Sequence, residues 1–199
     1  MTRMKIVGAD GDVPTEERPR VLGLFVDPGS IETGWCVAKP TPDFGLSVIA
    51  AGTIKRPKGM NPLLRIDGIR CDMMSLMNKL HPDLGDFVVE VTSGKVNRAR
   101  HGGGGAGLGV HGMAVGTLWT MGLMWRPAGG AGPTVTPVPE NVWKAGFGKL
   151  KSAHVAKRYF EQYDPSTDPE FNIADAVALA VWYYTLWMRK RAEKSGGGR

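Results

Sequence analysis

Two short and almost uninterrupted apolar runs constrain the fold of this chain more than any other feature. Residues 21–26 (VLGLFV) and 86–91 (DFVVEV) have the length of strands but lack the alternation of a half-exposed sheet. Such runs are typical of strands that are covered on both faces, as in α/β proteins. The first run ends at Asp27 and the second contains Glu90. Because an isolated carboxylate is costly to bury, each acid needs a cation, a metal ion or hydrogen-bond donors.

A third acid, Asp175, interrupts an apolar helical pattern near the end of the chain, NIADAVALAVWYY. If the two strands are parallel neighbours, Asp27 and Glu90 meet at the carboxyl edge of the sheet, and a packed helix brings Asp175 to them. Converging carboxylate oxygens suit a hard cation such as Mg²⁺ or Mn²⁺. Each acid alone also has an ordinary explanation: a turn for Asp27, a lysine partner for Glu90 and a helix start for Asp175.

The remaining pattern predicts one α/β domain, and 199 residues that are 42% hydrophobic suffice for its core. We place this domain at residues 20–191, between a flexible arm at 1–19 and a flexible tail at 192–199. We expect strands at 21–26, 33–38, 46–54, 86–91 and 134–138, helices at 63–80, 108–125, 152–162 and 172–191, and a helical turn at 139–144.

Glycine and basic residues concentrate after the second apolar run. Seven of the 28 glycines lie in HGGGGAGLGVHG, and we expect a loop as far as Gly107 because consecutive glycines are costly inside a helix. The chain carries a formal net charge of +6. Basic residues on a glycine-rich loop suit contacts to nucleic-acid phosphates, or else the loop is a solvated linker. The basic residues in question are Lys95, Arg98, Arg100 and His101.

Compartment and membrane association follow from composition. Two cysteines cannot build a disulfide framework, and the first twenty residues lack the apolar core of a secretory signal, so we expect a cytoplasmic protein. Residues 108–125 contain no formal charge and include a Gly112–Gly116 pair. Because this segment is rich in Gly and Thr, we interpret it as a helix with a small-residue face, used inside the domain or across a dimer, and expect no membrane association.

Five segments in one consistent order resemble the RuvC-type Holliday junction resolvases, within the RNase H-like and retroviral-integrase superfamily. They span residues 21–188 and an ordered set is more specific than any single motif. The segments are VLGLFVDPGSIETGWCVA, FVVEVTSGK, GLGVHGMAVGTL, KSAHVAKRYF and NIADAVALAVW. The small size of the chain further suggests a phage-encoded member that acts in a bacterial host cell.

The resemblance implies an RNase H-like mixed five-stranded sheet, with three antiparallel strands followed by two parallel ones, flanked by helices. It implies that Asp27 is a ligand shared by two Mg²⁺ ions, for which Mn²⁺ substitutes, and that Glu90 and Asp175 are further ligands. These three acids are also the implied catalytic residues.

One position departs from the family pattern. The family usually has an acid or a histidine three residues before the last aspartate, and this chain has Asn172 there. Asn172 shares a helix face with Asp175 but offers a neutral and weaker ligand. An acid on the preceding loop, Asp168 or Glu170, is a candidate to complete the metal site.

A second basic group lies between the last strand and the last helix. Lys151 begins a segment that resembles the lysine-serine helix start near the family's active site, so we expect it to be catalytic and to neutralise the scissile phosphate. Lys144 and Lys149 are expected to bind nucleic acid together with the glycine-rich loop. The alternative for all three is an ordinary solvated surface.

The function that the resemblance implies is that of a crossover junction endodeoxyribonuclease. Such an enzyme resolves four-way DNA junctions by paired symmetric nicks, and two metal ions hydrolyse the phosphodiester. The resemblance also implies a homodimer. Residues 108–125 are the expected interface, because Gly109, Gly112 and Gly116 allow two helices to approach closely.

Three alternatives stay open at this point. The same fold can serve a nuclease for flaps, other branched DNA or RNA–DNA hybrids. The neutral Asn172 suggests a protein that binds junctions without cutting them. Asp27-Pro28-Gly29-Ser30 also resembles the first phosphate loop of actin-like kinases, although the chain is too short for their two lobes.

Overall fold

The computed structural model describes residues 22–41, 45–91, 105–127, 131–148 and 150–187. The predicted arm at 1–19 and the predicted tail at 192–199 lie outside these ranges. So do five of the predicted nucleic-acid-binding residues: Lys95, Arg98, Arg100, His101 and Lys149.

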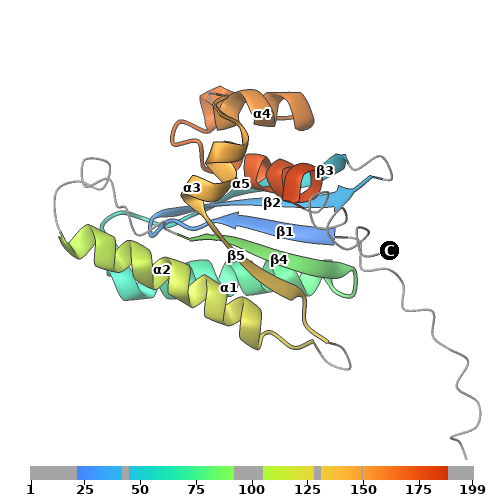
Figure 1. The fold of residues 1–199 in the computed structure, drawn as a ribbon. Coiled ribbons are helices and arrows are strands. Elements are labelled where there is room, and N and C mark those ends of the chain that lie inside the picture. The colour runs from blue at the N-terminus through green and yellow to red at the C-terminus, as the bar shows by residue number, and fades with distance from the viewer. Residues whose placement is uncertain (1–21, 42–44, 92–104, 128–130, 149, 188–199) are drawn as a thin grey trace, which may run out of the picture.

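Five strands form one mixed sheet in the order β3-β2-β1-β4-β5 (Figure 1). The first three strands are antiparallel neighbours, and β1, β4 and β5 run parallel to one another. Their bounds are β1 (Leu22–Asp27), β2 (Glu32–Pro40), β3 (Leu46–Lys55), β4 (Leu84–Val91) and β5 (Thr134–Pro139). This confirms the predicted mixed five-stranded sheet, with three antiparallel strands followed by two parallel ones.

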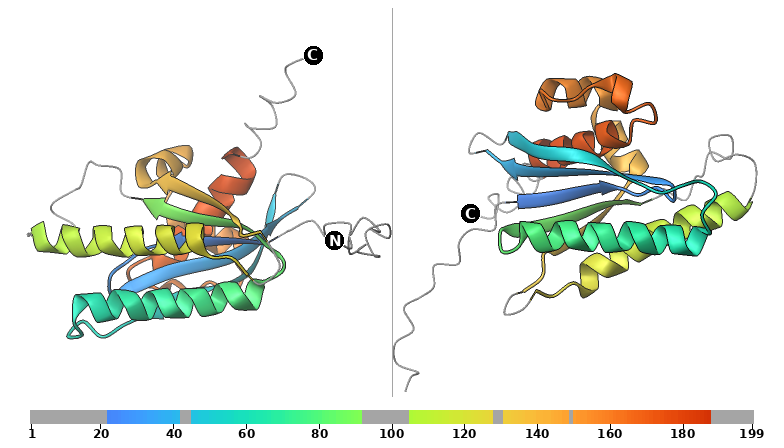
Figure 2. Two further views of the ribbon diagram at one scale, coloured as in Figure 1. Left: turned by 90° about the horizontal axis from the view of Figure 1, so that it is seen from below. Right: turned by 180° about the vertical axis from the view of Figure 1, so that it is seen from behind.

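Helices cover both faces of the sheet, as Figures 1 and 2 show. Helices α1 and α2 lie on one face, and α4 and α5 lie on the other. Helix α3 follows β5 directly, at the edge of the sheet. The bounds are α1 (Pro62–Leu80), α2 (Gly105–Met124), α3 (Glu140–Gly146), α4 (Ser152–Tyr159) and α5 (Asn172–Val181), with a 3₁₀ turn (Pro165–Thr167) and a π-helical turn (Trp182–Trp187).

Strand β1 has an apolar partner on each side, which explains its continuous hydrophobic sequence. Leu24 and Val26 are fully buried against the core under α1 and α2. Phe25 is fully buried in the other core, beneath α5. Because successive side chains of a strand point to opposite faces, Asp27 shares the face of Phe25 and so faces the side of α5.

Three helices differ from the prediction. Helix α4 ends at Tyr159 and not at residue 162, because the backbone of Phe160 is extended. Helix α2 begins at Gly105 and not at residue 108, so part of the glycine run is helical. Extending a formed helix by one residue costs less than starting one, so the long apolar helix that follows can absorb these glycines. The last predicted helix is regular only as far as Val181 and then widens into the π-helical turn, where the Thr185 hydroxyl donates a hydrogen bond to the Val181 carbonyl at 2.6 Å. Within the described ranges, no helix has both the length and the hydropathy needed to cross a bilayer.

Candidate functional site

The register of β1 and β4 brings Asp27 and Glu90 to the same edge of the sheet. Val26 pairs with Val89 across these parallel strands, so the two acids are the next residues along each strand. Both are partly exposed, whereas the residues just before them are buried. The predicted meeting of the two acids therefore follows from the pairing of their strands.

Helix α5 supplies Asp175 to this edge, and Gly34 permits the approach. Gly34 lies on β2 and pairs with Asp27 of β1. A Cβ atom at Gly34 would collide with the backbone carbonyl of Asn172, the first residue of α5. The missing side chain of Gly34 thus lets the start of α5 lie against the end of β1, with Asn172 and Asp175 one helical turn apart.

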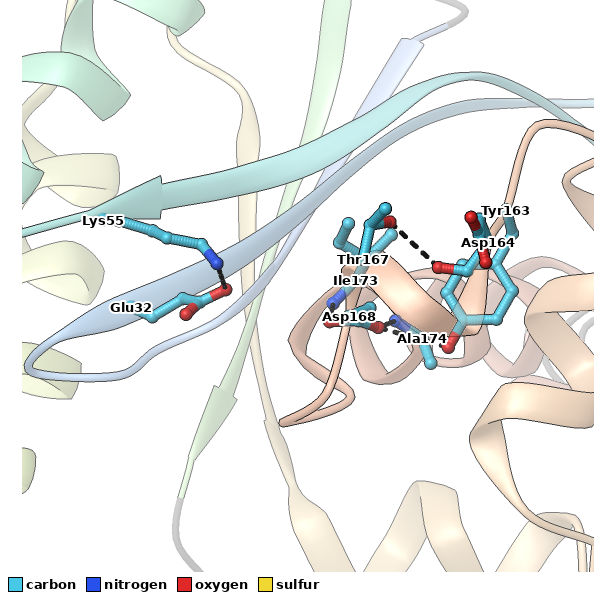
Figure 3. A network of polar contacts seen from close by, with 8 residues as sticks. All are labelled: Glu32, Lys55, Tyr163, Asp164, Thr167, Asp168, Ile173 and Ala174. Atoms are coloured by element: carbon cyan, nitrogen blue, oxygen red, sulfur yellow. Dashed lines mark hydrogen bonds and ion pairs between the residues drawn. The ribbon is translucent and has the colours of Figure 1, made fainter.

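A buried carboxylate anchors the first turn of α5 (Figure 3). Asp168 is fully buried and accepts hydrogen bonds from the backbone N–H groups of Ile173 (3.1 Å) and Ala174 (2.9 Å). Its Oδ2 also accepts a hydrogen bond from the Tyr163 hydroxyl at 3.2 Å. The oxygens of Asp168 therefore satisfy the helix start, and Asp168 is not the acid that compensates for Asn172. Glu170, the other acid suggested for that role, is exposed.

Helix α3 contributes three side chains that border the acids. The buried Trp143 donates its indole N–H to Glu90 Oε2 at 2.8 Å. The ammonium of Lys144 lies 2.7 Å from Glu140 Oε1 and 3.1 Å from Asp175 Oδ2. It also lies 5.0 Å from the centroid of the Trp143 ring. One short helix thus orients Glu90 and places a cation beside Asp175.

The charges of these groups act on one another. Burial raises the pKa of Asp27 well above its usual range, and the charges of Glu90 and Asp175 raise it further while Lys144 opposes them. Burial likewise raises the pKa of Glu90 to about 7, although the Lys144 charge and the Trp143 hydrogen bond lower it. Clustered carboxylates with raised pKa values and a shared cation are typical of a functional site.

The donor set fits a hard divalent cation in its chemistry. Carboxylate oxygens, the ligands that such cations prefer, come from Asp27, Glu90 and Asp175. The Lys144 ammonium, which is itself a cation, lies beside Asp175. Among the described residues, no three acidic, histidine or cysteine side chains are close enough to hold an ion as they stand.

Of the predicted lysines, the two that the structure describes occupy different places. Lys144 contacts the acidic group, as described above, whereas Lys151 is exposed and is the N-cap residue of α4. Trp143 and Glu140 were not predicted to belong to the site. Glu140 carries the same signal as Asp27, an acid at the end of a strand, but the two prolines of that strand weaken the pattern. No local sequence signal connects Trp143 with Glu90, which is 53 residues away.

Solved structures share this fold. The chain is similar to RuvC from Thermus thermophilus in complex with a Holliday junction substrate, with a TM-score of 0.64, 18% identity, and coverage of 86% of this chain and 96% of that one. A second Thermus thermophilus RuvC structure gives a TM-score of 0.60, 17% identity, and coverage of 85% and 96%. The yeast mitochondrial Holliday junction resolvase Ydc2 gives 0.59, 14% identity, and coverage of 90% and 82%.

The likeness defines the fold as that of the RuvC resolvases, which is RNase H-like. No protein-family model and no curated protein matches the sequence. The fold-level part of the resemblance noted in the sequence is thereby confirmed.

Proposed function

We propose that this protein is a metal-dependent endonuclease that resolves four-way DNA junctions by paired symmetric nicks. One observation carries the proposal: on a fold shared with RuvC, strands β1 and β4 and helix α5 bring Asp27, Glu90 and Asp175 to one edge of the sheet. The Thermus thermophilus RuvC of that comparison is in complex with a Holliday junction substrate. Four-way junction DNA is accordingly the substrate that we propose for this chain.

The chain's own residues have distinct parts in this proposal. Asp27, Glu90 and Asp175 would hold two Mg²⁺ ions, for which Mn²⁺ would substitute, and Asn172 would add a neutral oxygen. Ions held there would supply an activated water and would neutralise the leaving 3′ oxygen. Trp143 keeps the Glu90 carboxylate oriented through its indole N–H.

Basic residues would hold the DNA around the metal site. Lys151 is proposed to neutralise the scissile phosphate. The other proposed DNA contacts need only a positive charge near the backbone, and their loss should reduce the salt dependence of binding. These residues are Lys95, Arg98, Arg100, His101, Lys144 and Lys149.

We further propose that the protein is a homodimer that pairs through the segment 108–125. In the described chain, nothing lies within 4 Å of a Cβ atom built on Gly109, Gly112 or Gly116, so these glycines do not serve packing inside the domain. Large apolar side chains of α2 are exposed beside them, among them Trp119 (39%) and Met124 (74%). A groove of about 690 Å³ between α1 and α2 lies next to this surface. An apolar helix face of this kind suits a second copy of the chain.

Sedimentation velocity tests the dimer. Met124→Glu is expected to shift the protein from dimer to monomer, because it introduces a charge into an apolar interface. Met60→Glu, an exposed methionine in the loop before α1, is the matched control and should leave the dimer intact. A wild-type protein that stays monomeric at every concentration would contradict the dimer proposal.

Nicking of a synthetic four-way junction in Mg²⁺ tests the function. Asp27→Asn is expected to abolish nicking, whereas Asp83→Asn should not, because Asp83 is exposed at the opposite end of β4. A flap, a Y-shaped duplex and an RNA–DNA hybrid are compared in the same gel. Equal cleavage of all substrates would indicate a nuclease of broader specificity and contradict the preference for junctions. Binding without any cleavage would indicate a non-catalytic junction-binding protein.

A further inference from the structure

The candidate site has three acids, and the position where the resemblance implies a fourth group holds the neutral Asn172. The two compensating acids suggested by the sequence do not fill the gap. Asp168 satisfies the first turn of α5, and Glu170 is exposed on the loop before it. A fourth carboxylate for this site would therefore have to come from another element.

Strand β5 delivers Glu140 to the same edge as Asp27 and Glu90. It runs parallel to β4, and Glu90 pairs with Val138. Glu140 is the second residue beyond Val138 and the first residue of α3. Three neighbouring parallel strands, β1, β4 and β5, thus each end near an acid, and the carboxyl ends of such strands are where α/β proteins place their sites.

The contacts of Lys144 show that Glu140 and Asp175 face one position. A single ammonium nitrogen lies 2.7 Å from an oxygen of Glu140 and 3.1 Å from an oxygen of Asp175. The Asp175 side chain is 18% exposed, whereas that of Glu140 is 35% exposed and so remains accessible to solvent. The charge of Glu140 also helps to raise the pKa values of Asp27 and Glu90, so it acts on the other two acids as well.

We propose that Glu140 is the fourth carboxylate of the divalent-cation site, and that the Lys144 ammonium holds this place until a metal ion displaces it. The inference rests on the proposed function, because it assumes that Asp27, Glu90 and Asp175 bind the ion. Glu140 then restores from the β5 side the negative charge that Asn172 lacks on the α5 side. Lys144, once released from Glu140 and Asp175, becomes available to a phosphate.

Calorimetric titration of the full chain with Mn²⁺, without DNA, separates the roles. Glu140→Gln is expected to weaken binding by at least roughly tenfold, because a charged oxygen ligand is lost. Glu170→Gln, the matched exposed acid, should bind as the wild type does. Lys144→Met is expected to tighten binding by roughly tenfold, because it removes a competing cation from the same position. Tighter binding cannot arise from misfolding, and the Mn²⁺-induced rise in melting temperature provides a second readout.

The outcomes distinguish this inference from the proposed function. If Asp27→Asn binds Mn²⁺ as tightly as the wild type, the proposed metal site, and with it the proposed function, is wrong. If Asp27→Asn weakens binding but Glu140→Gln does not, only the role of Glu140 is wrong. Unchanged or weaker binding by Lys144→Met would show that its ammonium is a structural partner of these acids and not a placeholder for the metal.

Discussion

Trp143 and Glu90 are joined by a hydrogen bond of 2.8 Å from the indole N–H to the carboxylate. Trp143 is 1% exposed, so its ring is held by the core while its polar edge reaches the acidic site. The ring packs edge-on against Phe147 and carries Lys144 over its face. A core residue thereby orients a carboxylate of the candidate site.

Replacing Trp143 with Phe is expected to impair junction nicking more than it impairs folding. The change removes the donor to a partly buried carboxylate, which costs about 1–3 kcal/mol of stability. Tyr183→Phe is the matched control, because the buried Tyr183 donates its hydroxyl to Asp86 Oδ1 at 3.1 Å, near the start of β4 and at the opposite end of that strand from Glu90. Urea unfolding should show similar losses for both variants, but nicking should fall only for Trp143→Phe. Equal nicking by the two variants would mean that Trp143 does not orient Glu90.

Metal binding should strengthen with pH across neutrality. Because the pKa of Glu90 is raised to about 7, part of the protein near neutrality carries a proton on Glu90 that a metal ion must displace. The raised pKa of Asp27 acts in the same direction. We expect the Mn²⁺ affinity to rise between about pH 6 and pH 8, with proton release detected by calorimetry in buffers of different ionisation enthalpy. An affinity that does not change over this range would contradict the raised pKa values.

The metal-free protein should show the opposite trend in stability. The folded pKa of Glu90, about 7, lies above its ordinary value of 4.5. The folded state therefore binds a proton that the unfolded chain has already released, so this contribution to stability is present below about pH 4.5 and is lost as the pH rises through 7. Glu90→Gln is expected to flatten the melting temperature over this window. A variant with the same pH profile as the wild type would exclude Glu90 as the cause.

Gly34 is expected to tolerate no side chain. A methyl group there meets the Asn172 carbonyl, so Gly34→Ala should push the start of α5 away from β1 and cost about 1–3 kcal/mol. Displacement of Asp175 should lower nicking by roughly 10- to 100-fold. Gly59→Ala is the control, because a Cβ atom built on Gly59 has open space around it. Wild-type nicking by Gly34→Ala would show that the site does not depend on this close approach.

Asp168→Ala tests whether the anchor of α5 is structural. The variant leaves the N–H groups of Ile173 and Ala174 without their acceptor, and we expect a loss of about 1.5–3 kcal/mol in urea unfolding. The affinity of the folded protein for Mn²⁺ should fall less than in Asp27→Asn, since Asp168 is not a proposed ligand and acts on the site only through the α5 turn that carries Asp175. A marked loss of Mn²⁺ binding without loss of stability would instead return Asp168 to the metal site.

The sheet and two of its acids could be predicted because their signals are local. A run such as VLGLFV must be covered on both faces, and an acid at its end lies at the sheet edge whatever the rest of the chain does. The roles of Asp168 and Trp143 could not be predicted in this way. In the sequence Asp168 is a candidate metal ligand, but in the structure its oxygens accept hydrogen bonds from the backbone at the start of α5. By its sequence context Trp143 has the character of a core residue, and only its orientation in the folded chain reveals the hydrogen bond to Glu90.

Helix α2 shows the limit of local propensity. Consecutive glycines predict a loop up to Gly107, yet the helix begins at Gly105, since the apolar turns that follow outweigh the conformational cost of glycine. Glu140 shows the opposite case. The strand before Glu140 has a weak sequence signal because it contains two prolines. That a third parallel strand also ends near an acid became evident only from the pairing of β4 with β5.

Anomalous diffraction from crystals of the protein grown with Mn²⁺ and four-way junction DNA would locate the metal site itself. We predict manganese peaks bound by Asp27, with Glu90 and Asp175 as further ligands, next to a phosphate at the junction centre. Manganese bound elsewhere, or a cleaved junction with no ion in contact with Asp27, would contradict it.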